Sequence, residues 1–436
     1  MLNEEEVKKI IEKVLSFSKA DETSIFITGG RTGNIRYARN TVSTSGEKDN
    51  LTLIITSSFG KRTGSASTNE FSNASIEKTV RLAEETAKLA PENPEYISIL
   101  GPQQYAKANT YSEQTAKLVA SSRADIALGS IKTCIEKKAV AAGYLEDNSL
   151  LTAFGNSKGL FGYNRETTID FTITARTQDD KGSGFAWQAF NDASLLNSKA
   201  ATEIAIQKAV ASANTTEMPP GKYTVILEPA ALWELLNSFM GALDARGAEE
   251  GRSFFSKKGG GTKLGEQLFS EKLSIYSDPS YPGLPGAPFA NDGRPQEKVV
   301  WVEKGVLKNF NYSRYWAEKK GVKALPANSS VIIEEGAQTL DEMIRSTVKG
   351  ILVTRMWYVR SVDPQNILLT GLTRDGVFYI ENGVIKNAVK NFRWNESPVN
   401  VFRNLETVGK AVRVGNCMIP AVKTRDFNFA SISDAV

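Results

Sequence analysis

The 436-residue chain is longer than one ordinary domain, so two or three domains are expected. Apolar residues make up 41% of the chain and charged residues 23%, a composition typical of a soluble globular protein. The net charge of +4 is small, and the basic residues form no cluster along the sequence. The composition therefore gives no reason to expect a nucleic acid or a membrane as a partner.

Two residue counts limit the chemistry further. The chain has no histidine, which excludes a Ser-His-Asp triad, a Cys-His pair and a zinc site built on histidines. Its two cysteines, Cys134 and Cys417, are too few for a disulfide framework and fit a reducing compartment.

The pattern at the amino terminus predicts an amphipathic helix rather than a signal peptide, and no apolar run approaches the roughly 18–20 residues that cross a bilayer. We therefore expect a cytoplasmic protein.

The sequence pattern in the first quarter of the chain predicts a helix, a group of strands and a second helix. Short strands separated by glycine-rich turns are expected at 24–28, 34–38 and 51–58, with the turns at Gly29-Gly30 and 60–64. The second helix, at 75–90, carries apolar residues on one face and is stopped by Pro91. The proline-bearing stretch 91–109 then predicts a linker.

The second quarter predicts a long helix, further strands and another helix. Thr110 and Glu113 have the spacing of a capping box, so the helix is expected to run from Thr110 to about Glu136. Alternation predicts strands across 140–190, with turns at Gly155, Gly159 and Gly162. A helix at 200–213 is followed by Pro219-Pro220-Gly221, the clearest domain boundary in the chain.

The stretch 222–265 organises the second half. A strand at 223–227 leads through Glu228-Pro229 into a helix, and the helix leads into a charged, glycine-rich loop. The helix carries an apolar stripe made of Leu232, Leu235, Leu236, Phe239, Met240 and Leu243. Its other side carries the small and polar residues Asn237, Ser238 and Gly241. We ask whether that side performs chemistry.

The sequence pattern in the rest of the second half predicts mainly strands. Asn382-Gly383 between apolar runs predicts a hairpin. Further strands are expected at 297–310 and 418–422, and short helices at 313–320, 340–346 and 401–405. We therefore predict an α+β fold, with a mixed amino-terminal region of paired helices and antiparallel sheets followed by a β-rich carboxy-terminal domain. The predicted parts are an amino-terminal subdomain at 1–108, a middle subdomain at 109–219 and the carboxy-terminal domain at 220–436.

Two groups of residues outside the helix could carry chemistry. Asp244, Glu249 and Glu250 could bind a hard metal or share a proton. The interleaved Arg246 and Arg252 favour ion pairs that fix a loop instead. Cys417 could be a nucleophile or a metal ligand, but its apolar flank, Met418-Ile419, favours a buried cysteine.

The stretch 222–265 resembles the TldD/PmbA family, known as peptide-maturation proteases and as modulators of DNA gyrase. The resemblance continues in order along the carboxy-terminal half, through GRSFF at 251–255, YSDP at 276–279, NDG at 291–293, EKGVL at 303–307 and IENG at 380–383. It extends more loosely over the amino-terminal half.

The departure from the family pattern bears on function. In protease members the helix carries a leucine pair followed by H-E-x-x-x-H, whereas here Leu235-Leu236 is followed by Asn237, Ser238 and, at the second histidine position, Ala242. The family's third ligand is a cysteine near the carboxy terminus, and Cys417 lies in roughly that stretch. Zinc hydrolysis needs neutral imidazoles and a carboxylate base. We therefore expect no catalytic residue and no cofactor, although active members bind zinc.

The resemblance implies a non-catalytic subunit of a peptide-processing dimer, either a homodimer or a heterodimer with a TldD-like subunit. The subunit would dimerise through its carboxy-terminal half and shape a cavity in which an extended peptide or unfolded protein binds as an added strand. One alternative is an active metallopeptidase or other hydrolase with a rebuilt site of Asp244, Glu249 and Glu250. Another is a binding module that acts on gyrase or another toxin target.

Overall fold

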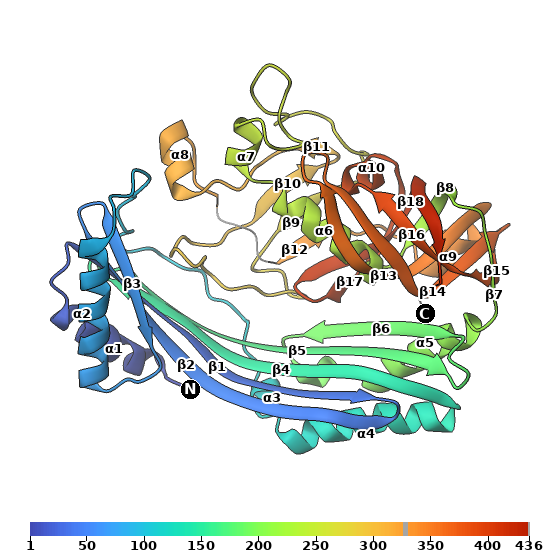
Figure 1. The fold of residues 1–436 in the computed structure, drawn as a ribbon, viewed down its shortest axis with the longest axis horizontal. Coiled ribbons are helices and arrows are strands. Elements are labelled where there is room, and N and C mark those ends of the chain that lie inside the picture. Colours follow the sequence, from blue (N-terminus) through green and yellow to red (C-terminus); the bar gives the residue numbers. More distant parts are fainter. Residues whose placement is uncertain (326–329, 435–436) are drawn as a thin grey trace.

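The computed structural model describes residues 1–325 and 330–434, which form two β-sheets, one in each half of the chain (Figure 1). The amino-terminal sheet has six strands in the order β3-β2-β1-β4-β5-β6, and every neighbouring pair is antiparallel. Its strands are β1 (Glu22–Ala38), β2 (Thr41–Phe59), β3 (Arg62–Thr68), β4 (Ala139–Asn156), β5 (Phe161–Thr177) and β6 (Ser183–Phe190).

Helices cover the outer face of this sheet, and the inner face is turned toward the carboxy-terminal half (Figure 1). The helices are α1 (Glu4–Phe17), α2 (Asn73–Leu89), α3 (Glu113–Ala116), α4 (Ala120–Glu136) and α5 (Ser198–Ala211). Alternation along β4 explains the arrangement, because Leu145, Leu151 and Ala153 are buried on the helix side. The residues at the alternate positions, such as Glu146, Asn148 and Thr152, point to the inner face, which leaves that face free to line a cleft.

The strands expected at residues 24–58 are longer than predicted. β1 passes through Gly29 and Gly30 without a turn, so the turn predicted there is wrong. These glycines have φ of 129° and 136°. A Cβ on Gly29 would lie 2.1 Å from the Asn50 carbonyl oxygen, and one on Gly30 would lie 2.3 Å from that of Ser149. Close approach of neighbouring strands, rather than a turn, requires glycine here.

The long helix predicted from Thr110 is also wrong at its start. Thr110 lies extended beside β5, where its carbonyl accepts a hydrogen bond from the Thr167 N–H at 2.9 Å and its hydroxyl donates to the Arg165 carbonyl at 2.7 Å. Ser112 caps the short helix α3, and α4 follows after a break. Tertiary contacts have overridden the local capping pattern. Of the three turns predicted at glycines in 140–190, only the one at Gly159 is observed, because the other two glycines lie within β4 and β5.

The carboxy-terminal half is built on a twelve-stranded sheet, as counted over the described residues. Its strands are β7 (Thr215–Thr216), β8 (Gly221–Leu227), β9 (Ile275–Ser277), β10 (Val299–Glu303), β11 (Val306–Leu307), β12 (Val331–Ile333), β13 (Lys349–Asp363), β14 (Leu368–Glu381), β15 (Val384–Val389), β16 (Asn391–Glu396), β17 (Leu405–Val414) and β18 (Cys417–Ser433). Its helices are α6 (Pro229–Gly241), α7 (Ala245–Glu249), α8 (Arg314–Lys320), α9 (Leu340–Arg345) and α10 (Pro398–Arg403).

The predicted α+β class is confirmed. The hairpin predicted at Asn382-Gly383 joins β14 to β15, with both turn residues at positive φ. The six-stranded sheet crosses the boundary predicted between residues 108 and 109, and the division into three parts stays a prediction. Within the part of the chain that the structure describes, no helix is long and apolar enough to cross a membrane.

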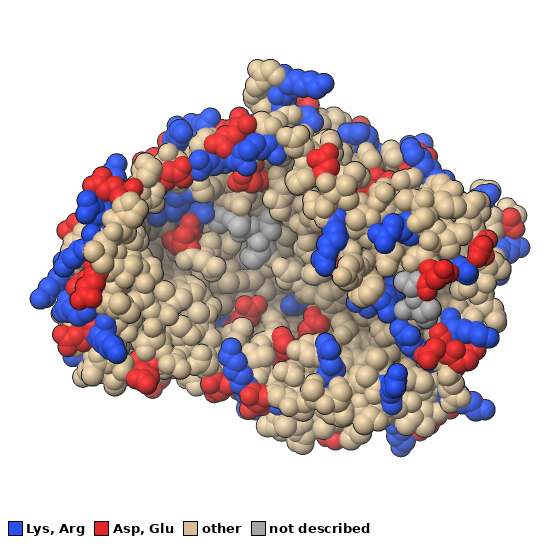
Figure 2. Space-filling view, in the orientation of Figure 1, with Lys and Arg blue, Asp and Glu red and all other residues tan. Residues whose placement is uncertain are grey.

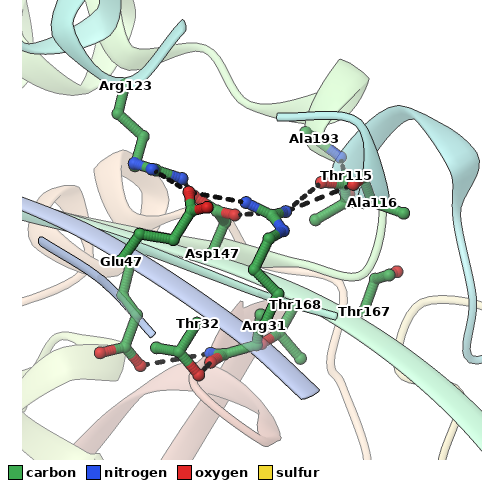
Figure 3. A network of polar contacts seen from close by, with 12 residues as sticks. Arg31, Thr32, Glu47, Thr115, Ala116, Arg123, Asp147, Thr167, Thr168 and Ala193 are labelled. Atoms are coloured by element: carbon green, nitrogen blue, oxygen red, sulfur yellow. Dashed lines mark hydrogen bonds and ion pairs between the residues drawn. The ribbon is translucent and has the colours of Figure 1, made fainter. Parts of the chain in front are cut away.

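A group of four charges, of which Arg123 and Asp147 are fully buried and Glu47 is exposed, joins α4 to the six-stranded sheet (Figure 3). Arg123, which is 0% exposed, donates to Asp147 at 2.8 Å and to Glu47 at 2.6 Å. Arg31 pairs with the same two carboxylates, at 2.8 Å and 3.5 Å. Gly33 provides the space, because a Cβ there would lie 2.0 Å from Nη1 of Arg123. The two cations and two anions neutralise each other, with the Arg123–Asp147 pair inside the fold and Glu47 at its surface.

Glu22, at the start of β1, ties the predicted linker to the sheet. Its carboxylate accepts hydrogen bonds from the hydroxyls of Tyr96 and Ser98 and from the N–H of Ile99 at 3.0 Å. Lys158 forms an ion pair with it at 2.7 Å. Burial alone would raise the pKa of Glu22, but these hydrogen bonds outweigh burial and lower the pKa to about 2.

We expect the Glu22 carboxylate to make the free energy of unfolding depend on pH in the acid range. Because its pKa is lower in the folded state than in the unfolded chain, its contribution is fully present above about pH 4.5 and is lost as the pH falls toward 2. A shift of this size corresponds to about 3 kcal/mol. Urea denaturation between pH 2 and 6 should show that Glu22→Gln loses this share of the pH dependence. Parallel curves for the variant and the parent would contradict the assignment.

Candidate functional site

The helix α6 forms as the sequence predicts. It follows β8, the neighbour of β13 and β18 in the sheet, and Pro229 stands in its first turn. All members of the predicted apolar stripe are buried, with exposed fractions of 0–7%: Leu232, Leu235, Leu236, Phe239, Met240 and Leu243. This stripe belongs to the largest core cluster of the protein. The helix is thereby fixed on its apolar side.

The opposite side of α6 faces the six-stranded sheet. Trp233 packs against Trp187 of β6, with ring centroids 5.3 Å apart. Helical spacing places a partly exposed row on this side, and we call it the cleft face: Trp233, Glu234, Asn237, Ser238 and Gly241. Trp233 thus links this side of α6 to the amino-terminal half, and the polar residues noted in the sequence lie partly exposed on the same side.

The three positions that correspond to the protease motif lie at the carboxyl end of α6. Ser238 donates its hydroxyl to the Glu234 carbonyl of its own helix at 3.0 Å, and Ala242 is the C-cap residue. A cavity of about 340 Å³ opens beside Ser238, Gly241 and Ala242, and the β13–β14 hairpin forms its other wall. Neither an amide, a hydroxyl engaged within its helix nor a methyl group fits the donor set that zinc prefers. The residues of this chain do not fit a zinc ion here.

Cys417 is buried, with 1% exposure, at the start of β18. Burial raises the pKa of its thiol to about 12, although Arg413 acts in the opposite direction. Its sulfur lies 3.5 Å from Oδ1 of Asn416. Burial therefore disfavours the thiolate, the form in which a cysteine binds a metal.

The acidic residues that follow α6 are held in local contacts. Asp244 caps α7 by accepting from the Gly247 N–H at 2.7 Å. Glu250 pairs with Arg246 at 2.9 Å and with Arg252 at 2.6 Å, and both arginines lower its pKa. The structure thus has the ion pairs that the alternating charges favoured.

Glu249 is the most enclosed carboxylate of this group. It accepts hydrogen bonds from the Tyr312 hydroxyl at 2.8 Å and Nε1 of Trp316 at 3.1 Å, and Lys320 lies 2.7 Å away. Burial would raise the pKa of Glu249, but the contacts with Lys320 and Tyr312 outweigh it and lower the pKa. Within residues 1–325 and 330–434, no three His, Cys, Asp or Glu side chains lie together in a way that could hold a metal ion.

We expect Glu249→Gln to affect stability rather than any activity. The substitution removes a charge that three donors satisfy, so the free energy of unfolding should fall by about 2 kcal/mol. Chemical denaturation measures this loss. Glu271→Gln, at an exposed position, is the control. A Glu249→Gln variant as stable as the parent would contradict this structural role.

The inner face of the six-stranded sheet forms the floor of a hollow beneath the carboxy-terminal half (Figure 2). A polar row crosses three strands, because Thr32 donates to Asn148 at 2.7 Å and Asn148 donates to Thr168 at 3.1 Å. On the adjacent pleat, Glu146 and Asp170 are directly paired across β4 and β5. We call this hollow the cleft, with the inner face as its floor and the cleft face of α6 above it.

No residue of this floor was predicted from the sequence. Burial raises the pKa of Asp170, and the like charge of Glu146 adds to that rise, while Nε1 of Trp187 donates to Asp170 at 3.0 Å and lowers it. The alternation along β5 could have indicated this floor, because the partly exposed Thr168, Asp170 and Thr172 alternate there with buried residues. Only the pairing of strands reveals that the polar sides of β1, β4 and β5 form one surface.

Comparison with known proteins agrees with this architecture. Sequence models of three domains of one family match in order: PmbA/TldA metallopeptidase domain 1 over residues 23–87, the central domain over 69–213 and the C-terminal domain over 220–431. Together they account for nearly the whole chain. The protein belongs to the PmbA/TldD family.

Individual family members are distant in sequence. The chain is 23% identical to Metalloprotease PmbA of Escherichia coli O157:H7, over 96% of this chain and 95% of that protein. It is 23% identical to a metalloprotease of Methanothermobacter thermautotrophicus, over 61% of each chain. The match to that archaeal relative thus spans less than two thirds of its length. The fold is shared with the crystal structure of TldE from Thermococcus kodakarensis, with a TM-score of 0.86, 21% identity and coverage of 97% of this chain and 99% of that one.

Proposed function

We propose that this protein is a catalytically silent member of the PmbA/TldD family that holds an extended peptide in the cleft. The observation that carries the proposal is the cleft face of α6, where Asn237 and Ser238 stand, with Ala242 after them, at the positions of the family's zinc motif. The helix and its apolar packing are present in this chain, whereas the metal-binding groups of the motif are replaced.

The side chains at the positions of the zinc motif support the proposal that the protein is catalytically silent. Hydrolysis of a peptide bond by zinc needs ligands that hold the ion and a base that takes a proton from its bound water. Asn237 is a poor ligand, Ser238 cannot act as the base, and Ala242 can do neither. Burial of Cys417 in the core disfavours its thiolate, and Glu249 and Glu250 are engaged in ion pairs.

The floor of the cleft supports the peptide-holding role. Its polar row, Thr32, Asn148 and Thr168, offers donors and acceptors without a large apolar surface. An extended chain that binds mainly through its backbone is recognised with little dependence on its sequence. Such a site suits unfolded segments of varied composition.

The second part of the proposal is assembly with another subunit. The family resemblance implies a dimer, either with a second copy of this chain or with a TldD-like subunit that carries H-E-x-x-x-H. In the mixed dimer this chain would contribute a wall of the peptide cavity, and the partner would supply zinc and the catalytic base. A cytoplasmic location fits the two unpaired, buried cysteines.

The test mixes the purified chain with a histidine-bearing homologue from the same source. Light scattering measures assembly, and the hydrolysis rate of an unfolded peptide is compared for each protein alone and for the mixture. We expect a mixed dimer that cleaves faster than the homologue alone. An unchanged rate together with two separate species would contradict the subunit role.

A further inference from the structure

A second cavity, of about 610 Å³, lies where the end of β6 meets the β17–β18 hairpin. Its size is that of an ordinary ligand pocket, roughly 300–1,000 Å³. Much of its wall is apolar, formed by Tyr111, Trp187, Phe190, Leu195, Val412 and Met418. Since Trp187 also packs against Trp233 on the cleft face, the cavity adjoins the cleft that we propose for the peptide.

Arg413 brings a positive charge into this apolar wall. Its Nε donates to the Gly415 carbonyl at 3.1 Å, and its Nη1 donates to Oδ1 of Asn191 at 2.5 Å. A guanidinium has five N–H donors, so these contacts use two of them. Among the described residues, no carboxylate lies within 4.0 Å of it, the limit for an ion pair.

Asn191 holds Arg413 in position. This residue is buried, and its Nδ2 donates to the carbonyls of Thr110 at 3.2 Å and Thr167 at 2.9 Å. Its Oδ1 therefore faces Arg413 in a fixed orientation. With the Gly415 carbonyl as the second anchor, the guanidinium is pre-organised while donors remain for a ligand.

Three carboxylates surround this cation without neutralising it by direct contact. Asp192 is occupied by the Ser194 N–H at 2.9 Å, and Asp170 accepts from Nε1 of Trp187. Glu166 and Asp170 attract Arg413 from beyond ion-pair distance, yet burial dominates and lowers the pKa of Arg413. Burial also raises the pKa of Glu166, so its negative charge is itself disfavoured. The site lacks a close anion.

We infer that this cavity binds the carboxy-terminal residue of the peptide, with its free carboxylate on Arg413 and an apolar side chain against Trp187 and Phe190. The inference rests on the proposed function, because it concerns one end of the peptide that the cleft holds. The ligand chemistry required is an apolar body joined to a carboxylate. The continuity with the cleft through Trp187 favours a peptide end over a free small acid.

The test measures binding of a fluorescently labelled ten-residue peptide that ends in leucine, made as the free acid and as the carboxamide. We expect the full chain to bind the acid about 10- to 100-fold more tightly than the amide. Arg413→Gln should abolish the difference in affinity between the acid and the amide. The circular dichroism spectrum of the variant should match that of the parent, which shows that the variant is folded. Arg393→Gln, at an exposed position on β16, should behave like the parent.

The outcomes separate this inference from the proposed function. Equal affinity for acid and amide overturns the inference and leaves peptide holding intact. Absence of binding by both peptides contradicts peptide holding itself, and the inference fails with it. If 3-phenylpropanoate binds in an Arg413-dependent way while the two peptides bind equally, the cavity serves a small carboxylate and the inference is overturned.

Discussion

Replacing Arg123 by alanine is expected to lower the free energy of unfolding by about 3–5 kcal/mol. Arg123 is fully buried and bonds Asp147, which is also fully buried, at 2.8 Å. The truncation leaves three charges, Arg31, Glu47 and Asp147, around a cavity (Figure 3). Chemical denaturation followed by circular dichroism gives the loss directly.

The controls separate the charge imbalance from a loss of packing. Lys132→Ala, at an exposed position on the same helix, should change stability by no more than about 0.5 kcal/mol. The pair Arg123→Met with Asp147→Leu removes one charge of each sign and should cost less than Arg123→Met alone. If the double variant is the less stable of the two, net charge is not the cause.

Replacing Phe239 by alanine is expected to cost about 3–5 kcal/mol. Phe239 lies on the buried side of α6, and its ring makes edge contacts with three others: Phe255 at 5.8 Å, Phe269 at 5.3 Å and Phe402 at 5.2 Å. The truncated side chain would leave a cavity that these rings cannot fill without moving. Thermal and chemical denaturation both measure the loss.

Asn237→Ala, two residues earlier on the cleft face, is the matched variant. Asn237 is partly exposed, so we expect a change of no more than about 0.5 kcal/mol. The contrast tests whether the two sides of α6 have separate roles, one in the core and one at the cleft. A loss of several kcal/mol for Asn237→Ala would show that the motif position has become part of the structural core.

Local patterns predicted much of the fold. The apolar stripe of α6 and the Asn382-Gly383 hairpin depend on residues close in sequence, and the structure has both. The predictions from the sequence were wrong at positions whose conformation depends on backbone atoms far away in the sequence. Gly29 accommodates the Asn50 carbonyl of the neighbouring strand, and Thr110 bonds to Thr167, which is far along the chain. Such contacts produce no periodic pattern of residues in the sequence.

The residues of the candidate site likewise divide into those that could be predicted from the sequence and those that could not. Asn237 and Ser238 could be located from the sequence because the resemblance follows a local motif. The environment of Arg413 could not, since it depends on Asn191 from the other half of the molecule. The same holds for Trp187, which joins β6 to α6 through Trp233. Sites between two halves of a chain require the pairing of strands to be known first.

The most direct test of the central claim is metal analysis of the isolated full-length chain after incubation with zinc and an unfolded peptide. The bound zinc is measured after gel filtration, and mass spectrometry determines whether the peptide is intact. We predict zinc far below one ion per chain and a peptide that is bound but uncleaved. One zinc ion per chain together with cleavage products would contradict the account.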